Sequence, residues 1–522
     1  MKFLLAFLLT SFSSLAQTGT FRKQYHLSNY DAASVHVLPD SSYVLLGNSY
    51  PGPIEHAAII KLSPAGQVQW TKTYSQGTAA GVGISGGIPL SGGGYLLGQW
   101  GSFGTSPGNS NRFIRTDASG NLLYVREHKF AANSSDLLAA QIQTTDGYII
   151  NVGATYDSSM QSSAFHITKL DTAGNLIWDL AVETNANSSK ESALNVIECS
   201  DGNYVVCGRS VNSLNGSFDC YVVKVSPSGT VIWNKFYGTA NYDAAYGVAE
   251  LSDGSLVFTA LSDSLGQSLL LFFKTDTGGN LAWCKSYTSL PLVIGVQLKR
   301  RSGDRLISTG YAVSSTQAPF LLALDSAGNV QWCRYYFMNG NGVSTSVQLT
   351  PDNGFVLAGT LTDTLTFHDD IFLIKTDSVG KSDCLGTPVT CTAAPFALTE
   401  LSFGYSLTGG YLQPNVTSVV SSSVVTTVLC VDETGMQDRQ EENNLVVFPN
   451  PVSDQLSISA KNTLRETTLQ LFDALGREAL RKNTGDLAAG ETLTLPVDLP
   501  PGIYQLLIRH ADGMEKKKLI IR

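Results

Sequence analysis

The residues best suited to catalysis are spread along the whole chain. Seven histidines stand at positions 26, 36, 56, 128, 166, 368 and 510, and none belongs to an H-E-x-x-H motif. The stretch GISGG at 83–87 has the G-x-S-x-G spacing of a serine hydrolase, but that motif needs a strand-to-helix turn. Its surroundings are typical of a strand, so we interpret Ser85 as part of a glycine-rich strand. We predict no catalytic, cofactor-binding or metal-ligating residue and no cofactor, and the sequence favours a protein that is not an enzyme.

A recurring aspartate is the next candidate for chemistry. LDTAGNLIW at 170–178 returns as TDASGNLLY at 116–124, TDTGGNLAW at 275–283 and LDSAGNVQW at 324–332. A catalytic acid occurs once, whereas this aspartate occurs in most copies. Asp accepts hydrogen bonds from backbone N–H groups two residues on, and Gly takes the positive-φ position of a type I turn with a G1 bulge. We therefore interpret the motif as a turn between two strands rather than as a calcium or catalytic site.

The motif repeats with a period of 49 to 55 residues. Each copy holds four short strand-like runs separated by turn residues, which is typical of one blade of a β-propeller. The third-strand marker occurs seven times, so we predict an all-β, seven-bladed β-propeller. An aromatic residue ends each copy, Cys384 fills the last equivalent position, and we expect each aromatic to pack against the next blade: Phe21, Trp70, Tyr124, Trp178, Trp233, Trp283 and Trp332.

The ends of the repeat region predict how the ring closes. The seventh copy, SVGKSDC, lacks the aromatic and the Lys-x-Tyr residues that follow it, whereas FRKQY at 21–25 matches WTKTY at 70–74. We predict that this N-terminal strand completes the seventh blade, because closure removes exposed sheet edges. In the second copy His128 holds the position of the tyrosine, and we interpret it as a packing residue.

The repeats resemble a known family. The pattern DGGYLLxG…IxKLDxxGNxxW is similar to the SBBP-like propeller repeats of secreted bacterial proteins, over roughly residues 21–384. The resemblance carries no enzymatic implication.

The composition and the N-terminus indicate export. Among 522 residues only 15% are charged and 49 are glycine, as expected for an all-β protein with many turns. The net charge of −9 argues against nucleic-acid binding. The segment MKFLLAFLLTSFSSLAQ predicts a signal peptide over 1–16, cleaved between Ala16 and Gln17. We expect no transmembrane segment.

Eight cysteines in an exported chain permit disulfides. Cys207 has two candidate partners, Cys199 across a hairpin and Cys220 on a neighbouring strand. Cys284 and Cys333 follow repeat tryptophans on separate blades, so we expect both to be free. One bridge is plausible within the group outside the repeats: Cys384, Cys391 and Cys430.

The composition changes after residue 384. Within residues 385–444, the stretch PNVTSVVSSSVVTTVLC at 414–430 alternates apolar and hydroxyl residues, which indicates exposed strands. The acidic, polar stretch at 432–444 is expected to be a linker. We therefore predict a signal peptide at 1–16, the propeller at 17–384, a β-rich extension and linker at 385–444, and a small β domain at 445–522.

The last domain resembles the type A C-terminal sorting domain of the type IX secretion system of Bacteroidota. The resemblance implies an Ig-like β-sandwich, the type IX secretion machinery as a partner, and a protein anchored at the cell surface or released. The residues that carry it, which we take as the sorting motif, are Pro449, Asn450, Pro451, Asp473, Gly476, Arg477, Gly502, Tyr504, Lys517 and Lys518.

Three functions are compatible with the sequence. We predict a non-catalytic binding module for an extracellular glycan or protein, because no copy of the repeat stands out by clustered acids or histidines. The alternatives are a polysaccharide-active enzyme with its site in the central channel, and a structural spacer at the cell surface. Fold alone cannot choose among them.

Overall fold

A computed structural model of the chain describes most of the repeat region and of the C-terminal domain. The predicted signal peptide and its cleavage site, Cys384, and the first six sorting-motif residues lie outside the described residues. The described ranges are 19–26, 30–49, 55–75, 83–102, 108–157, 162–184, 190–212, 216–264, 267–288, 292–313, 316–364, 368–382, 386–402, 405–408, 411–415, 418–420, 425–431, 445–448, 454–472, 478–497, 499–500, 502–510 and 513–521.

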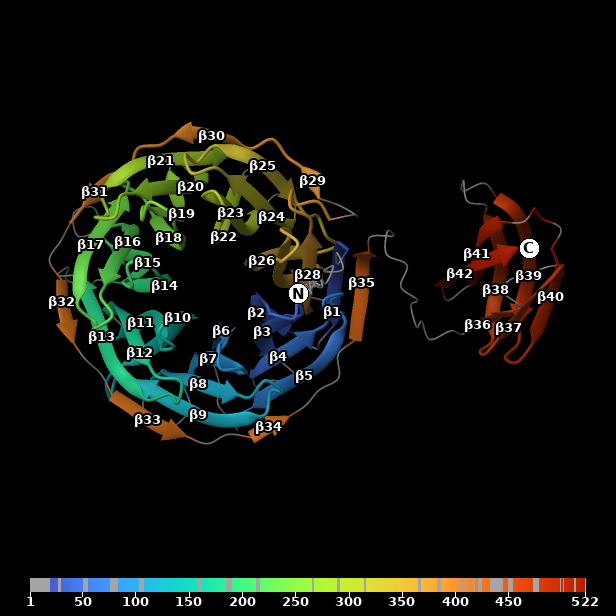
Figure 1. The fold of residues 1–522 in the computed structure, drawn as a ribbon, viewed down its shortest axis with the longest axis horizontal. Coiled ribbons are helices and arrows are strands. Elements are labelled where there is room, and N and C mark those ends of the chain that lie inside the picture. The colour runs from blue at the N-terminus through green and yellow to red at the C-terminus, as the bar shows by residue number, and fades with distance from the viewer. Residues whose placement is uncertain are drawn as a thin grey trace, which may run out of the picture. The chain divides into compact units, whose positions relative to one another are not determined.

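Within the described residues, every regular element is a strand, and seven five-stranded sheets stand around a ring (Figure 1). In each sheet four strands follow one another from the centre outwards, each pairing antiparallel with the next. We number the sheets 1 to 7 along the chain. An all-β, propeller-like architecture is therefore confirmed.

The inner four strands of the first six sheets follow chain order. Sheet 1 holds β2 (Tyr30–Val37), β3 (Tyr43–Ser49), β4 (His56–Leu62) and β5 (Val68–Ser75); sheet 2 holds β6 (Gly83–Pro89), β7 (Tyr95–Gly101), β8 (Ser110–Thr116) and β9 (Leu122–Lys129); sheet 3 holds β10 (Ser135–Gln143), β11 (Ile149–Tyr156), β12 (Ser163–Leu170) and β13 (Leu176–Thr184). Sheet 4 holds β14 (Ser192–Glu198), β15 (Tyr204–Val211), β16 (Phe218–Val225) and β17 (Val231–Gly238); sheet 5 holds β18 (Asp243–Glu250), β19 (Leu256–Ser264), β20 (Gln267–Thr275) and β21 (Leu281–Thr288); sheet 6 holds β22 (Leu292–Arg301), β23 (Arg305–Val313), β24 (Gln317–Leu324) and β25 (Val330–Tyr335).

Sheet 7 joins the two ends of the repeat region. It holds β26 (Asn341–Leu349), β27 (Phe355–Thr362) and β28 (Asp369–Thr376), followed by the N-terminal strand β1 (Phe21–His26). Phe21 lies opposite Lys375 and Tyr25 opposite Ile371 in an antiparallel ladder. The N-terminal strand thus takes the fourth position of the last sheet, as its sequence match to residues 70–74 predicts.

The segment 387–431 forms an outer belt, which the sequence did not predict. It runs round the ring against the order of the sheets and adds a fifth, outermost strand to each one (Figure 1, orange). These strands cover edges that would otherwise expose unpaired backbone groups. From sheet 6 back to sheet 1 and then to sheet 7 they are β29 (Thr387–Pro388), β30 (Thr392–Pro395), β31 (Thr399–Leu401), β32 (Tyr405–Thr408), β33 (Tyr411–Asn415), β34 (Ser418–Val420) and β35 (Val425–Val431).

The recurring turn has the geometry that its residues demand. In the turn between the third and fourth strands of sheet 2, Asp117 accepts hydrogen bonds from the backbone N–H of Ser119 and of Asn121, at 2.9 and 2.8 Å. Gly120 has a φ of 73°, and the ladder register shifts at the end of β8, which marks a bulge. The aspartate is therefore used to shape the turn.

The same turn receives the neighbouring sheet. A Cβ atom on Gly120 would lie 3.0 Å from the Trp70 ring, so glycine lets the indole of sheet 1 pack directly on the turn of sheet 2. Lys72 donates to the Asn121 side chain at 2.8 Å, and Tyr74 donates its hydroxyl hydrogen to the Gly120 carbonyl at 2.6 Å. The glycine–aromatic contact recurs round the ring: Phe21–Gly66, Tyr124–Gly174, Trp178–Gly229, Trp233–Gly279, Trp283–Gly328 and Trp332–Gly380.

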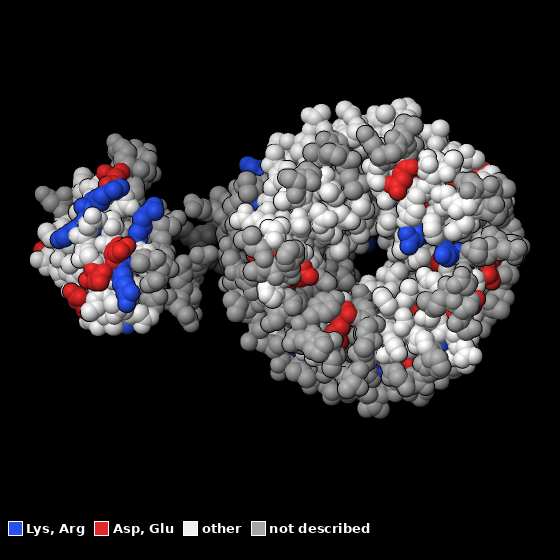
Figure 2. All heavy atoms as spheres, turned by 180° about the vertical axis from the view of Figure 1, so that it is seen from behind, with Lys and Arg blue, Asp and Glu red and all other residues white. Residues whose placement is uncertain are grey.

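Figure 2 shows the ring from behind, with a narrow opening at its centre. The described residues on this face are mostly uncharged, with a few isolated charged groups.

The C-terminal unit, Gly435–Arg522, is a separate compact body. One of its sheets has the order β36-β37-β40 and the other the order β39-β38-β41-β42, and a shared core includes Leu456, Leu471 and Leu506. The strands are β36 (Leu445–Phe448), β37 (Gln455–Ala460), β38 (Leu464–Phe472), β39 (Glu478–Leu487), β40 (Thr492–Pro496), β41 (Gly502–His510) and β42 (Gly513–Ile521).

Over the described part of the chain, the structure contains no helix with the length and apolar character needed to cross a membrane.

Candidate functional site between sheets 2 and 3

The contacts between neighbouring sheets depart from the common pattern at two junctions, between sheets 2 and 3 and between sheets 3 and 4. At five junctions a tyrosine hydroxyl donates to the carbonyl of the glycine in the next turn: Tyr25 to Gly66, Tyr74 to Gly120, Tyr237 to Gly279, Tyr287 to Gly328 and Tyr336 to Gly380. Sheet 2 has His128 at this position and sheet 3 has Val182. His128 contacts Asp179 in sheet 3.

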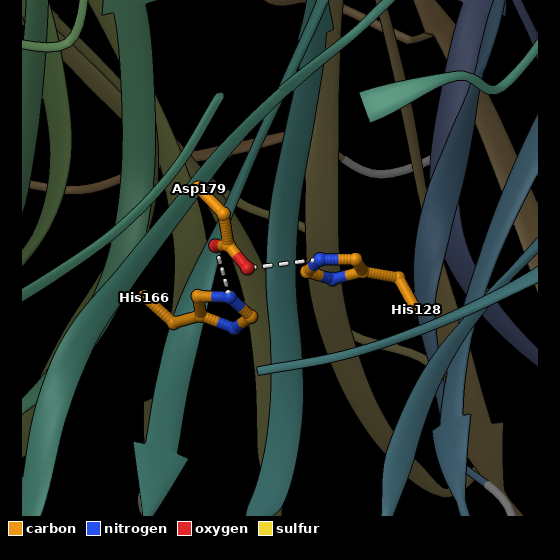
Figure 3. A group of neighbouring side chains, drawn as sticks. All are labelled: His128, His166 and Asp179. Atoms are coloured by element: carbon orange, nitrogen blue, oxygen red, sulfur yellow. Dashed lines mark hydrogen bonds and ion pairs between the residues drawn. The ribbon is translucent and has the colours of Figure 1, made fainter. Parts of the chain in front are cut away.

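Two histidines and an aspartate meet at the junction of sheets 2 and 3 (Figure 3). The Nε2 atom of His166 lies 2.8 Å from Oδ1 of Asp179, and Nε2 of His128 lies 2.9 Å from Oδ2 of the same carboxylate. The two imidazole rings are nearly parallel, with centroids 5.5 Å apart. At most 2% of each side chain is exposed, so this His–Asp–His cluster is shielded from solvent.

The strand register explains how the cluster is assembled. His166 lies on β12 and Asp179 on β13, where Thr168 is the residue opposite Asp179, so the two side chains share one face of sheet 3. His128 lies on β9, the fourth strand of sheet 2, four residues after Tyr124, the aromatic residue of that sheet that packs on the next turn (the docking aromatic). Three strands from two repeats therefore supply the three side chains.

All three residues depart from the repeat. At the position of His166 the other sheets have Ala58, Arg112, Tyr221, Leu271, Phe320 and Phe372. At the position of Asp179, the residue after the docking aromatic, they have Arg22, Thr71, Val125, Asn234, Cys284 and Cys333. In the sequence the histidines look scattered, so the cluster was not predicted. Comparing aligned positions of the repeats, rather than neighbouring residues, would have revealed it.

The cluster has strong internal electrostatics. Burial raises the pKa of Asp179, but the nearby imidazoles of His166 and His128 outweigh burial, so the pKa lies well below its ordinary value. Burial lowers the pKa of His166, and the negative charges of Asp179 and Asp136 reverse this and leave the pKa above its ordinary value. The arrangement therefore favours an ionised Asp179 and a positive charge beside it.

Other charged residues are buried nearby, although Arg112 and Glu127 lie with Ile114 and Val125 on the face of sheet 2 that packs on sheet 1. Arg112 and Glu127 form an ion pair of 3.1 Å with almost no exposure, and burial lowers the pKa of Arg112 to about 10. Asp136 accepts hydrogen bonds from the Phe130 N–H and from the Thr155 hydroxyl. Lys129 is also buried. Burial of charges costs stability unless they are well paired.

A pocket of about 480 Å³ opens beside the cluster. Aromatic, hydroxyl, amide and carboxyl groups line it, and none of the lining residues that the structure describes is Lys or Arg. They come from the connection between β9 and β10, the connection between β11 and β12, and the end of β13. The lining residues are Phe130, Ala131, Ala132, Asn133, Ser134, Thr155, Tyr156, Asp157, Ser162, Ser163, Ala164, Ala181 and Glu183.

The pocket and the His–Asp–His cluster share a wall. Ala181 lines the pocket and lies opposite His166 in the ladder of β12 and β13. Phe130, also in the lining, meets the His166 ring edge-on with centroids 5.4 Å apart. Only the side chains of this shared wall would thus separate a ligand in the pocket from His166.

Three hydroxyls of the pocket hold its backbone in place. Ser134 hydrogen-bonds within the β9–β10 connection, and Ser163 bridges to the backbone of Glu191. Thr155 donates to Asp136. The half-exposed or exposed residues Asn133, Tyr156, Asp157, Ser162 and Glu183 present polar groups at the mouth.

A second group of acids is buried in sheets 3 to 5, and one of them, Glu191, adjoins the pocket through hydrogen bonds between its backbone and Ser163. Burial raises the pKa of Glu191 to about 8 and that of Asp219 to about 6, and it also raises the pKa of Asp243. Glu191 accepts from the Thr184 N–H at 2.6 Å and Asp243 from the Thr239 N–H at 2.6 Å. Each closes the connection between two sheets, and all three are 2% exposed or less, so we interpret them as structural.

The remaining candidates from the sequence are reported where the structure places them. Ser85 lies in strand β6 and donates to the Leu138 carbonyl, so GISGG is not a nucleophile elbow. In the C-terminal unit, Gly502, Tyr504, Lys517 and Lys518 lie on the paired strands β41 and β42, and the Tyr504 hydroxyl donates to the Pro500 carbonyl at 2.9 Å.

The two disulfides considered for Cys207 are wrong. Cys199, Cys207 and Cys220 are thiols. Cys207 lies opposite Val222 rather than Cys220, and the backbone of Cys199 pairs with that of Asn203. Within the group outside the repeats, Cys430 lies on β35 and Cys391 packs against the core beside Cys333.

Comparison with known proteins identifies the C-terminal unit. Residues 446–522 match the family model of the secretion system C-terminal sorting domain. This domain marks proteins that type IX secretion exports, and that are attached to the cell surface or released from it. The protein is therefore exported by the type IX secretion machinery. All ten residues of the predicted sorting motif fall inside the matched range.

Several solved structures resemble the chain distantly. A polysaccharide lyase has 8% sequence identity and a TM-score of 0.43, with 66% of this chain and 90% of that chain covered. The core factor of S. cerevisiae has 12% identity, a TM-score of 0.37 and coverage of 70% and 59%. A puromycin hydrolase has 12% identity, a TM-score of 0.31 and coverage of 64% and 59%. No curated protein sequence matches the chain. Similarities this low carry no argument about function.

Proposed function

We propose that the exported ring is a binding module that takes a sugar unit of an extracellular glycan into the pocket between sheets 2 and 3. The pocket volume of about 480 Å³ lies in the range of small-ligand sites. Its hydroxyl, amide and carboxyl groups offer hydrogen bonds to sugar hydroxyls, and Tyr156 and Phe130 offer flat apolar surface. The lining contains the carboxyl groups of Asp157 and Glu183 but no Lys or Arg. Because these acids repel a carboxylate, the pocket favours a neutral or amine-bearing sugar over a uronic acid.

The observation that carries this proposal is the combination of pocket and broken repeat. A repeat that serves only to close a ring keeps the same contacts at every junction. Two junctions lack the tyrosine contact, and the one beside the pocket also buries the His–Asp–His cluster and Asp136.

The finer assignments of the architecture are part of the same proposal. We take the ring as a seven-bladed β-propeller, related to SBBP-like repeats of Bacteroidota and docked blade to blade by its aromatic residues. We take the C-terminal unit as an Ig-like sandwich. Export would begin with removal of residues 1–16 at the Ala16–Gln17 bond.

The test is a glycan and polysaccharide array with the mature chain, residues 17–522, scored for binding and for cleavage. We expect binding without cleavage, weakened at least about tenfold by Tyr156→Ala because an aromatic stacking surface is lost. Val211→Ala is the matched control, since Val211 ends strand β15 of sheet 4 as Tyr156 ends strand β11 of sheet 3. Binding that Tyr156→Ala leaves unchanged would contradict the proposed pocket.

A second function is favoured by one feature, the two carboxyl groups in the pocket lining. Asp157 and Glu183 are the residue types of a glycoside hydrolase, so the protein would then cleave the glycan. Release of reducing ends by the wild type, abolished by Glu183→Gln, would establish this function instead. No binding to any glycan or polysaccharide would favour a structural spacer.

A further inference from the structure

The His–Asp–His cluster has the donor set of a transition-metal site. Two imidazole nitrogens and one carboxylate suit Zn²⁺, whereas Ca²⁺ and Mg²⁺ prefer oxygen ligands. One ligand atom from each of His128, His166 and Asp179 lies within 4.8 Å of the others. Both Nε2 atoms face the same carboxylate (Figure 3).

The hydrogen bonding of the cluster is incomplete. Both ring nitrogens of His128 and Oδ2 of Asp179 are buried without a hydrogen-bond partner among the described residues. The 2.9 Å contact between His128 Nε2 and Asp179 Oδ2 therefore has the length of an ion pair but not the direction of a hydrogen bond. Buried polar atoms that lack partners cost stability, and a cation between these atoms would remove that cost.

The placement of the three residues supports the same conclusion. Each of the three differs from the residues that the other sheets have at the same position. All three meet at a single junction. None of the other sheets has a histidine or a carboxylate at these three positions.

We propose that His128, His166 and Asp179 bind one divalent transition-metal ion, with Zn²⁺ as the best match. The ion would bind the Nε2 atoms of both histidines and the carboxylate of Asp179. Binding needs both imidazoles without the proton on the ligating nitrogen, so it releases protons. The charged pair between His166 and Asp179 is then the metal-free state of the same site. The inference does not depend on what the pocket binds.

Two substitutions test the site and restore the repeat at the same time. His128→Tyr introduces the residue of five other junctions, and His166→Phe introduces the residue of sheets 6 and 7. His56→Ala on β4 of sheet 1 is the control, since this histidine lies outside the cluster.

The experiment uses the mature full-length chain, stripped with a chelator and titrated with Zn²⁺ by calorimetry, with Co²⁺ absorption as a spectroscopic signature. We expect one Zn²⁺ per chain, a visible Co²⁺ d–d spectrum, and at least about a hundredfold loss of affinity in His128→Tyr and in His166→Phe but not in His56→Ala. Wild-type protein without Zn²⁺ binding, or binding that both substitutions leave intact, overturns the proposal. If one variant fails to fold, the other decides.

A separate observation concerns Cys333 and Cys391. The outer belt passes the fourth strand of sheet 6 with Val389 N–H donating to the Cys333 carbonyl at 3.1 Å. Two residues further, Cys391 packs against the same core as Cys333, and the two thiols are hydrogen-bonded to each other. In sheet 5 the same positions hold Cys284, Phe396 and Leu398, where Phe396 N–H donates to the Cys284 carbonyl at 3.0 Å.

We infer that Cys333 and Cys391 form a disulfide in the exported protein and so fasten the belt to sheet 6. Both thiols lose their protons, one sulfur–sulfur bond forms, and the two electrons reduce a disulfide oxidant to two thiols. Exported proteins meet conditions in which disulfides persist. In the structure Cys284, Cys333 and Cys391 are thiols, as expected for Cys284 and Cys333, and the inferred bond would form on oxidation.

Peptide mapping of exported protein, alkylated without reduction, tests the bond. Trypsin and chymotrypsin separate Cys391 from the other cysteines by cutting at Leu385 and Phe396. We expect a linked peptide pair that contains Cys333 and Cys391 and separates on reduction, whereas Cys284 is recovered as a single alkylated peptide after denaturation. Recovery of Cys333 and Cys391 as separately alkylated peptides overturns the inference, and Cys391→Leu, which copies sheet 5, must abolish the linked pair.

Discussion

At the scale of single residues, the ring depends on positions where only one side chain works. Gly328 has a φ of 74°, and a Cβ atom there would lie 2.6 Å from the Trp283 ring. The glycine is needed both for the turn and for the approach of the neighbouring sheet. Such turns were predictable from the sequence, because Asp, Gly and Asn at fixed spacing define the turn locally.

A comparison of Gly328→Ala with Gly202→Ala distinguishes the requirement for a positive φ from the requirement for space beside the neighbouring sheet. Gly202 has a φ of 79° but nothing within 4 Å of its would-be Cβ. We expect Gly202→Ala to cost about 1–2 kcal/mol of unfolding free energy for the positive φ alone. Gly328→Ala adds a clash with Trp283 worth about 1–3 kcal/mol more. Chemical denaturation measures both, and equal losses in the two variants would refute docking at the turn.

Glu191 gives a prediction for the dependence of stability on pH. Burial raises its pKa in the folded protein to about 8 from an ordinary value of 4.5. Between these values the folded state keeps a proton that the unfolded state has lost, so stability falls as the pH rises from about 4.5 to 8. Gln keeps the shape and the acceptor for the Thr184 N–H without this penalty.

We therefore expect Glu191→Gln to raise the free energy of unfolding at pH 8 by up to a few kcal/mol, and so to raise the melting temperature. Near pH 4.5 we expect both to be unchanged. Thermal melts of the two proteins across this range measure the gap. A gap that stays constant with pH would show that Glu191 is ionised in the folded ring.

At the scale of elements, sequence periodicity predicted the strands but not the belt. The four strands of each repeat and the pairing of β1 follow from copies that can be compared within the chain. The strands of residues 387–431 are two to seven residues long and follow no repeat motif, so they read as a loose extension. Their positions are decided by the outer edges of the sheets, which no local pattern records.

The N-terminal strand tests the closure of the ring. Strand β1 pairs with β28 on one side and β35 on the other, so its removal leaves the last sheet without its fourth strand and the belt without a partner there. We expect deletion of residues 18–26 to lower the melting temperature of the whole ring and to promote association through the exposed edges. Differential scanning calorimetry and light scattering measure both effects. An unchanged melting temperature would mean that β1 is an accessory strand.

At the scale of the whole molecule, the chain combines a ring that carries the proposed binding site with a C-terminal sorting domain that directs export. Export could be predicted from the sequence because the sorting motif is local and ordered. The cluster at the junction of sheets 2 and 3 could not, because His128 and His166 are brought together only when two repeats pack. The regularity of the ring is what makes this departure informative.

Removal of residues 446–522 tests the export function directly. In a host with type IX secretion, we expect the truncated chain to be retained inside the outer membrane, while the complete chain reaches the surface or the medium. Fractionation with immunoblotting measures the distribution. The truncated chain must keep the melting temperature of the ring, since the two units have separate cores; efficient export of it would contradict the assigned role of the domain.

The central claim is that the junction of sheets 2 and 3 is the binding site. Hydrogen-exchange mass spectrometry of the mature chain, with and without the glycan that binds best on the array, locates that site. The account predicts slower exchange in peptides that cover 130–136 and 155–164, and unchanged exchange at the corresponding segments of the other six junctions. Protection centred on another junction, or spread evenly along the inner strands round the channel, would contradict it.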